Sequence, residues 1–350
     1  MKKHIFISLV SFLLPTLIIS SYANTIKERV PLKLHIDSIV VDSHNDTMMK
    51  IIDESTWLPV LDLRNDTDLH IDIPKLRAGN IKVSYFAAYS SSYHGRPNTS
   101  ASRTLALINA LYYTQRNNSD IFKIVKSYKE LERAVLDKKI AAVATIEGAY
   151  SITRENSTSL VNQYYDLGIR SIGFTWNYSN ELAEGLYRAY GDREGTRSPK
   201  GLTSLGKDMV RELNDLGIII DVSHLSPDSF YDVITITRSP IIASHSVAIS
   251  VFNHPRNLDD FQLRKIQENN GVVGVVYHEE FVNGVGTSYV ANIVDHIDHI
   301  VNLIGVDHVG LGSDFDGAHL PNDLQESSKV YRITEELFRR GYSDSDIKKI

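Results

Sequence analysis

The 350-residue sequence contains no cysteine. Disulfide bonds are therefore excluded, and the fold must be held together by a hydrophobic core, for which 42% apolar residues are ample. Thiolate metal ligands are excluded as well. Any metal site in this protein must be built from histidine and carboxylate side chains.

Blocks of lysine and arginine are also missing. The chain has 37 basic and 43 acidic residues, which give a formal net charge of -6 and a pI of about 6.1. Nucleic-acid-binding surfaces are usually strongly basic, so this balance argues against a nucleic-acid partner. We expect a small molecule or a peptide as the partner.

A long apolar run is missing too. The apolar stretch 5–19 is short for a membrane span and contains Pro15. Because it follows two lysines and precedes small residues, it is typical of a secretory signal peptide, predicted here at 1–23 with cleavage after Ala23. An uncleaved anchor is the alternative. We therefore expect a periplasmic or secreted protein, formed by residues 24–350, with no stable membrane span.

Residues 24–350 contain no low-complexity linker and no repeat of fixed period, so we expect a single domain. Short β-branched runs ending in polar or glycine residues alternate with longer amphipathic segments, such as 203–217 and 290–305. Eight such runs predict an α/β fold, the (β/α)8 TIM barrel. The long stretch 177–204 is interpreted as an active-site loop. The predicted strands are residues 39–46, 81–89, 140–148, 169–176, 216–224, 240–245, 271–278 and 308–317.

The first predicted strand ends in an unusual way. In VVDSHNDTMM (40–49), an apolar pair leads into three polar residues at every second position. In an extended strand His44 and Asp46 share one face, about 7 Å apart, so both can reach one metal ion. Taken alone, the pattern also fits a strand end followed by a helix that Asp46 caps.

Other predicted strands end in the same kind of residue, and each has a simpler explanation. Glu147 could be a solvated turn residue, His224 and His245 could be bonded to nearby backbone, and Asp314 and Asp316 are residues that suit turns. However, the carboxyl ends of barrel strands surround a single mouth. The combination therefore predicts a metal site there.

The number of these groups exceeds what one tetrahedral zinc ion needs. A bridging carboxylate would allow two ions to share the set, and two divalent ions roughly 3.5 Å apart can hold a hydroxide and polarise a carbonyl. Hydrolysis is the reaction that this arrangement suits.

Several ordered motifs in the sequence resemble the membrane dipeptidase family of zinc dipeptidases, which includes renal dipeptidase. The resemblance runs from Ile39 to the last residue and is closest to the bacterial members. The motifs are DSHND (42–46), DIPKLRAG (72–79), IEG (146–148), NELAEG (180–185), GLTSLGKDMVRELNDLG (201–217), DVSH (221–224), SHSVA (244–248), NHPRNLDD (253–260) and GVDHVGLGSDFDG (305–317).

The resemblance implies a distorted (β/α)8 barrel with two zinc ions per chain. His44 and Asp46 would bind the first zinc, His224 and His245 the second, and Glu147 would bridge them. A hydroxide held between the ions would then attack the peptide carbonyl.

The resemblance also implies residues that handle the substrate. Arg256 would bind its terminal carboxylate, because a guanidinium offers two parallel donors, although a loop salt bridge is the alternative. Asp314 would contact the amine or transfer the proton to the leaving group. Asp316 ranks lower, as a residue that supports the site or shapes the loop.

The sequence departs from the family pattern in two places. Trp176 stands where the mammalian members have a substrate-contacting histidine, which indicates an altered substrate contact or, alternatively, a core residue. The chain ends at GYSDSDIKKI (341–350), where relatives continue, so the closing segment of the family is expected to be missing.

We therefore predict an exported zinc dipeptidase that also accepts dipeptides with a D-residue at the C-terminal position. The alternatives are hydrolysis of N-acyl amino acids or of a β-lactam in the same site, or an inactive, truncated or purely binding homologue. The family resemblance further implies a homodimer, although the residues do not define an interface.

Overall fold

A computed structural model describes residues 30–91, 97–186 and 200–350. The predicted signal peptide at 1–23 lies outside these residues. The first described segment, 30–37, is helical and leads into the first strand of the barrel. The strands are β1 (Val40–Asn45), β2 (Ile81–Tyr89), β3 (Phe122–Ile124), β4 (Ile140–Glu147), β5 (Ile169–Gly173), β6 (Ile219–Asp221), β7 (Ile242–Ser246), β8 (Val272–Val275) and β9 (Val309–Leu311).

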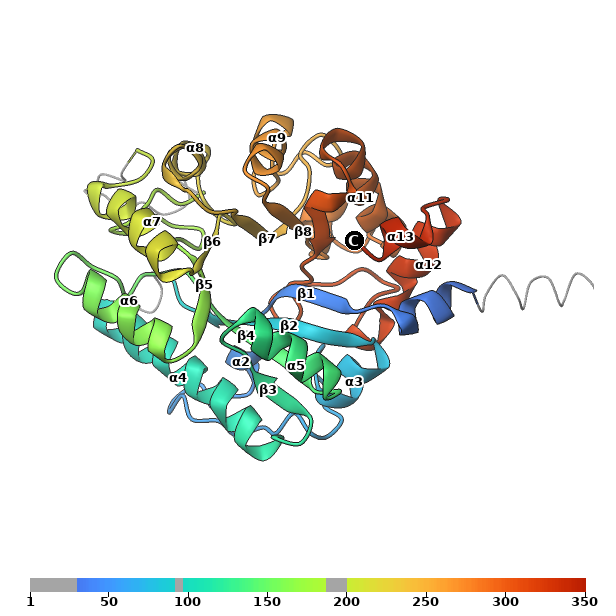
Figure 1. Cartoon of the computed structure of the whole chain (residues 1–350), viewed down its shortest axis with the longest axis horizontal. Helices are drawn as coiled ribbons and strands as arrows, with labels where there is room; N and C mark the ends of the chain where they lie inside the picture. Colours follow the sequence, from blue (N-terminus) through green and yellow to red (C-terminus); the bar gives the residue numbers. More distant parts are fainter. Residues whose placement is uncertain (1–29, 92–96, 187–199) are drawn as a thin grey trace, which may run out of the picture.

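Eight of these strands form a closed parallel barrel. The sheet order is β2-β1-β9-β8-β7-β6-β5-β4, and a further pairing of β2 with β4 closes the ring. Figure 1 shows the strands around the centre with helices outside them. The eight barrel strands are the eight that the sequence predicts, so the predicted (β/α)8 fold is confirmed. The ninth, β3, was not predicted and pairs in parallel with the first three residues of β4.

Several barrel strands are shorter than the predicted apolar runs. The strand predicted at 216–224 is reduced to β6, and the one predicted at 308–317 to β9. In both cases the polar end of the run leaves the ladder and becomes a loop at the barrel mouth. The residues that carry chemistry therefore follow these strands rather than belong to them.

Helices cover the outside of the barrel. The predicted helices are present as α7, which Thr203 caps and Gly217 ends with φ 71°, and α11, which ends at Gly305. The helices are α2 (Thr47–Lys50), α3 (Ile73–Ala78), α4 (Pro97–Asn117), α5 (Tyr128–Leu136), α6 (Ser157–Asp166), α7 (Ser204–Leu216), α8 (Pro227–Ile236), α9 (Asp260–Glu268), α10 (Glu279–Val282), α11 (Val290–Ile304), α12 (Tyr331–Arg339) and α13 (Asp344–Ile347), with 3-10 turns η2 (Val306–His308) and η3 (Ser327–Lys329).

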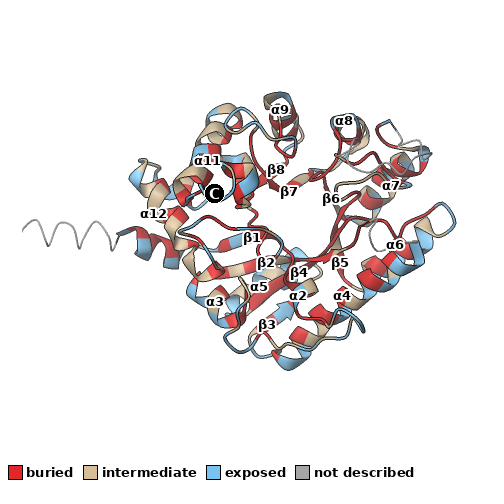
Figure 2. Cartoon of the chain, turned by 180° about the vertical axis from the view of Figure 1, so that it is seen from behind, coloured by how far each residue is buried: buried red, intermediate tan, exposed pale blue. Residues whose placement is uncertain are grey.

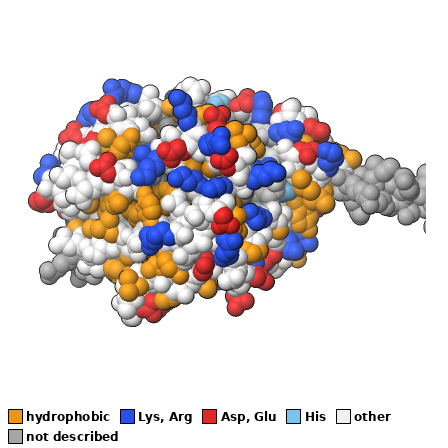
Figure 3. All heavy atoms as spheres, turned by 60° about the horizontal axis from the view of Figure 1, so that its bottom comes forward, with side chains coloured by type: hydrophobic (Ala, Val, Ile, Leu, Met, Phe, Trp, Pro, Cys, Tyr) orange, Lys and Arg blue, Asp and Glu red, His pale blue; other side chains and the backbone are white. Residues whose placement is uncertain are grey.

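The core lies between the strands and the surrounding helices. Every residue of β4 is buried, as expected for a parallel strand that is covered on both faces. Buried residues line the ring of strands in Figure 2, and the exposed residues are on the outward faces of the helices. On the face shown in Figure 3, acidic and basic side chains are interspersed with apolar ones.

Two connections differ from the others. The first crossover, from β1 to β2, contains only the short helices α2 and α3. The stretch predicted as an active-site loop is described in part, since 187–199 lie outside the described residues. Its described ends pair through a bridge of Ala183 with Leu202, and Gly185 forms a further bridge with Leu225 in the loop after β6.

The end of the chain lies at the amino-terminal end of the barrel. Residues 347–350, after α12, line a hollow there together with the first residues of β7, β8 and β9. Within the described ranges, the structure contains no helix that is both long enough and apolar enough to span a membrane.

Candidate metal centre

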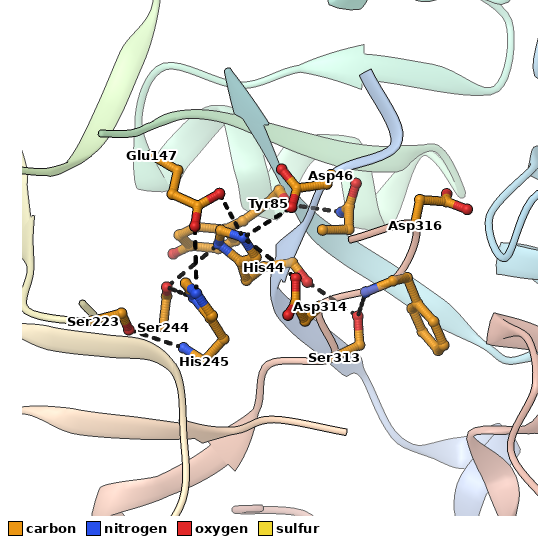
Figure 4. Close-up of polar contacts among 12 residues, drawn as sticks. His44, Asp46, Tyr85, Glu147, Ser223, Ser244, His245, Ser313, Asp314 and Asp316 are labelled. Atoms are coloured by element: carbon orange, nitrogen blue, oxygen red, sulfur yellow. Dashed lines mark hydrogen bonds and ion pairs between the residues drawn. The ribbon is translucent and has the colours of Figure 1, made fainter. Parts of the chain in front are cut away.

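The polar side chains predicted from the strand ends meet at the carboxyl end of the barrel, where most of them can be followed in Figure 4. They come from five different strands or the loops that follow them, and all are buried. Those residues are His44, Asp46, Glu147, His224, His245 and Asp314.

One half of the site surrounds the ring of His44. Its Nε2 atom lies 3.5 Å from Glu147 Oε2, 3.9 Å from Asp46 Oδ2 and 4.0 Å from Asp314 Oδ1. Within the described residues, His44 Nε2, Asp46 Oδ1 and Glu147 Oε2 are buried without a hydrogen-bond partner. Buried polar atoms are rarely left in this state, so the group has the character of a ligand set.

The other half of the site surrounds the second oxygen of Glu147. Glu147 Oε1 lies 2.9 Å from His224 Nε2 and 3.6 Å from His245 Nε2. The two Nε2 atoms are 2.8 Å apart. Each half can present three ligand atoms to one ion, and Glu147 contributes one oxygen to each half.

Three carboxyl groups, those of Asp46, Glu147 and Asp314, lie close together around His44 and are buried. Burial raises the pKa of Glu147 to about 7, and the charge of Asp46 adds to this effect. Burial also raises the pKa of Asp314 well above its usual range. For His44, burial alone would lower the pKa, but Glu147 and Asp46 outweigh it and raise the pKa well above its ordinary value. The three carboxyl groups thus favour a positive charge among them.

The other two histidines are held in the form that binds metals. Burial lowers the pKa of His224 and of His245 well below the ordinary value, and the charge of His44 acts in the same direction. Neutral imidazole and ionised carboxylate are the ligand forms that a divalent cation requires. The second half therefore presents its imidazoles in this form, and in the first half the carboxyl groups favour a cation in place of the proton on His44.

Two residues of this site have a strained backbone. His224 and Asp314 have φ values of 67° and 62°, in the left-handed region that non-glycine residues rarely adopt. Space is also reserved: a Cβ atom at Gly317 would collide with Asp46 Oδ2 and Asp314 Oδ1. The loop after β9 is thus shaped to bring two carboxylates close together.

Arg256 lies on the loop between β7 and α9 and is buried beside the second half of the site. Its guanidinium donates to Ser246 Oγ at 3.0 Å and to the carbonyl of His245 at 2.9 Å. It also lies 5.9 Å from the ring centre of Phe281. A pocket beside it is shared with His224.

Trp176 and Asp316 lie at the edge of the centre. Trp176 is half-buried, with its ring 5.5 Å from that of Tyr89 and 6.1 Å from that of His224. Asp316 does not face the ligand set. Its carboxylate accepts hydrogen bonds from Thr47 Oγ1 at 2.6 Å and from the backbone N–H of His70 at 2.7 Å, which connects the loop after β9 to the start of α2 and to the loop before α3.

Three supporting residues were not predicted from the sequence. Asn177 Oδ1 lies 3.0 Å from His224 Nδ1, and Ser244 Oγ lies 2.8 Å from His245 Nδ1 and 2.5 Å from Asp221 Oδ2. Asp221 and Ser244 each begin a motif that ends in or contains a ligand histidine, DVSH and SHSVA. Their position next to a ligand histidine in these motifs was the only feature of the sequence that could have indicated a supporting role. The contacts themselves join separate strands and cannot be read from the sequence.

A closed parallel barrel with buried histidines and carboxylates at its mouth defines a metal-dependent hydrolase. The family model described as membrane dipeptidase (peptidase family M19) matches residues 29–350, and the chain therefore belongs to this family. The predicted resemblance is confirmed, and the protein is a metal-dependent dipeptidase of the family.

Individual proteins show the same relationship. An uncharacterized protein in the pqqA 5' region of Klebsiella pneumoniae is 37% identical over 232 residues, 65% of this chain and 84% of its own. An uncharacterized dipeptidase of Schizosaccharomyces pombe is 30% identical, covering 86% of this chain and 74% of its own. A Rhodobacter sphaeroides metallopeptidase, liganded with a phosphinate mimic of the dipeptide L-Ala-D-Ala, has a TM-score of 0.81 and 26% identity, covering 89% of this chain and 96% of its own.

Proposed function

We propose that this protein is an exported dipeptidase that works with two zinc ions. His44 and Asp46 bind one ion, His224 and His245 bind the other, and Glu147 bridges them. The observation that carries this proposal is that the two oxygens of Glu147 face two separate ligand groups, 3.5 Å from His44 and 2.9 Å from His224.

Zinc suits a site of imidazoles and carboxylates without thiolates. Bound divalent ions supply a water molecule of lowered pKa and polarise the peptide carbonyl. The protein contributes the shape of the site and its proton carriers. Burial of the ligands excludes bulk water. The carboxyl group of Asp314, with Oδ1 4.0 Å from His44 Nε2, accepts a hydrogen bond from the substrate amine or gives a proton to the leaving nitrogen.

Arg256 orients the substrate in this proposal. Its guanidinium is held by Ser246 Oγ and the carbonyl of His245, so it is fixed next to one of the metal ligands. A fixed guanidinium binds a carboxylate through two parallel hydrogen bonds. A dipeptide has its free carboxylate one residue from the scissile bond, which suits an arginine beside the centre.

The substrate range includes dipeptides with a D-residue at the C-terminal position. The Rhodobacter sphaeroides relative, liganded with a mimic of L-Ala-D-Ala, supports this. The half-buried ring of Trp176 stands next to His224 and contributes a wall of the substrate pocket. Export rests on the predicted signal peptide at 1–23, which directs the protein to the periplasm or outside the cell.

A substrate panel tests the proposal. The purified protein is loaded with zinc and assayed with L,L and L,D dipeptides, N-acetyl amino acids and a β-lactam, next to His224→Ala and Asp314→Asn. We expect two zinc ions per chain, dipeptide cleavage and a large loss in both variants. Cleavage of the N-acyl amino acid or the β-lactam without dipeptide cleavage would reassign the activity. A folded, zinc-loaded protein that cleaves none of them would be a binding homologue.

A further inference from the structure

Behind the ligand histidines lies a buried hydrogen-bonded pair, Asp221 and Ser244. We infer that this pair determines which ring nitrogen of His245 and His44 carries the proton, and so turns both Nε2 lone pairs toward the metal ions. Asp221 and Ser244 are thus positioning residues that serve both halves of the centre. The inference rests on the metal ligands of the proposed function.

Ser244 Oγ is the centre of three contacts. It lies 2.5 Å from Asp221 Oδ2, 2.8 Å from His245 Nδ1 and 3.5 Å from His44 Nδ1. The ring planes of His44 and His245 are stacked with centres 3.7 Å apart and an angle of 27°. This stacking directs both Nδ1 atoms toward the same serine and both Nε2 atoms toward Glu147.

A serine hydroxyl has one proton to donate and two lone pairs that accept. A carboxylate accepts only, and Asp221 is the nearest neighbour, so the Ser244 proton points to Asp221. The lone pairs of Ser244 Oγ then face the histidines, and only an Nδ1–H can bond to them. In a neutral ring bonded in this way, Nε2 is left with a free lone pair, the form in which a histidine binds a metal ion.

Asp221 is fixed in the orientation that this requires. Its other oxygen, Oδ1, accepts from the backbone N–H groups of Ser223 and Ser244, both at 3.0 Å. These two bonds tie the end of β6 to β7 and would satisfy a purely structural role. Among the described residues, the second oxygen, Oδ2, accepts a hydrogen bond only from the Ser244 hydroxyl, which in turn contacts the histidines.

The third ligand histidine has a separate partner of the same kind. His224 Nδ1 lies 3.0 Å from Asn177 Oδ1, an acceptor that also favours the Nδ1–H form. All three ligand histidines therefore have an acceptor behind them, and Ser244 serves two. The role differs from that of Ser43, whose hydroxyl donates to the carbonyls of Ser244 and Leu311 and reaches no ring.

Three substitutions separate these roles. Ser244→Ala removes the shared acceptor. Asp221→Asn has nearly the same shape. Its amide oxygen must take the place of Oδ1, because that position accepts from the backbone N–H groups of Ser223 and Ser244. The NH2 group of the asparagine then faces the Ser244 hydroxyl. The serine proton is then pushed toward His245 Nδ1, which favours the wrong tautomer. Ser43→Ala is the control, because it removes a buried hydroxyl from the same layer without touching a histidine.

The readout is zinc affinity, measured by competition with a chelator on folded protein. We expect Ser244→Ala and Asp221→Asn to bind zinc about 10- to 100-fold more weakly, and Ser43→Ala to lose thermal stability without a change in affinity. Unchanged affinity in folded Ser244→Ala and Asp221→Asn would overturn the inference.

A second measurement does not depend on the variants folding. In the zinc-free wild-type protein, the ¹⁵N shifts of His245 report which nitrogen is protonated. We expect Nδ1–H, and finding Nε2–H would overturn the inference. If the wild type binds no zinc, the proposed function fails. The tautomer of His245 in the zinc-free protein still tests separately whether Ser244 and Asp221 place the proton on Nδ1.

Discussion

Buried histidines in this protein have more than one role. His296 lies in the middle of α11 rather than at the end of a strand, and it is fully buried. Its Nδ1 accepts from the backbone N–H of Ala248 at 3.2 Å, and its Nε2 donates to the carbonyl of Val282 at 3.0 Å. Only the neutral ring can make both bonds, and burial lowers the pKa of His296 to about 4.

We predict that His296 makes the fold sensitive to acid. Its folded-state pKa is below the unfolded value of 6.5, so the unfolded chain binds the proton first and stability falls as the pH drops from 6.5 toward about 4. Between pH 7 and pH 5, this effect lowers the free energy of unfolding by about 2 kcal/mol. Urea unfolding at both pH values should show a smaller acid loss in His296→Gln than in the wild type. Equal losses would show that His296 does not titrate in this way.

We predict that Arg256 discriminates for the free carboxylate of the substrate. The wild type should prefer a dipeptide strongly over the same dipeptide amide. Arg256→Lys keeps the charge but lacks the two parallel donors, so this preference should shrink by about 10-fold or more through a higher KM. Comparing kcat/KM for the two substrates measures it, and an undiminished preference in the variant would argue for a structural role of Arg256.

The ligand candidates were predictable because each interrupts an apolar pattern. A buried strand of valine or isoleucine is not expected to end in a histidine or a carboxylate. His44, Glu147 and His245 are such residues, and the structure brings them together. Asp221 and Ser244 break no pattern, because small polar residues are common at strand ends. Their contacts depend on the relative placement of β6 and β7, which only the folded barrel defines.

At the scale of elements, two glycines make room for the site. Gly274 in β8 and Gly312 just after β9 both face Ser43 and Ser244, and a Cβ atom at either would collide with the carbonyl of Ser244. Backbone atoms cannot rotate away as side chains do. These strands therefore have no side chain at the layer directly beneath the ligands.

We predict that Gly312→Ala destabilises the fold by about 1–3 kcal/mol through overpacking. Gly310→Ala, two residues earlier, is the matched control, since its Cβ would meet only Val272 Cγ1 at 3.6 Å and the Ile350 carbonyl at 3.9 Å. Urea unfolding of both variants checks this. If both lose the same stability, the cause is the general effect of alanine in this strand and not the collision with Ser244.

Eight barrel strands could be predicted from their β-branched composition and their spacing. The small strand β3 could not, because three residues, Phe122–Ile124, carry too little periodicity to be distinguished from a loop. The first crossover lacks a clear sequence pattern for a related reason. Its helices α2 and α3 have four and six residues, shorter than a periodic pattern needs.

At the scale of the whole molecule, the metal centre connects distant parts of the barrel. Its proposed ligands come from β1, β4, β7 and the loop after β6, which lie around the ring and are separated by up to 201 positions in sequence. Closure of the barrel brings them together, so the fold and the site depend on each other.

We predict that removing the metal lowers the stability of the whole fold. A ligand that binds only the folded state stabilises it by about 4 kcal/mol at a thousandfold excess over Kd. Thermal unfolding with zinc and with a chelator should therefore differ by several degrees, and zinc should restore the higher midpoint. Glu147→Gln should show little of this difference, because it loses the carboxylate shared by both halves. A full zinc response in Glu147→Gln would contradict the bridging role.

The two-zinc centre is tested most directly by a zinc titration of the metal-free protein with hydrolysis of L-Ala-D-Ala as the readout. We expect no cleavage without metal and an activity that rises and saturates at two zinc ions per chain. Cleavage that does not depend on metal, or activity that is complete at one ion, would contradict the proposed two-zinc centre.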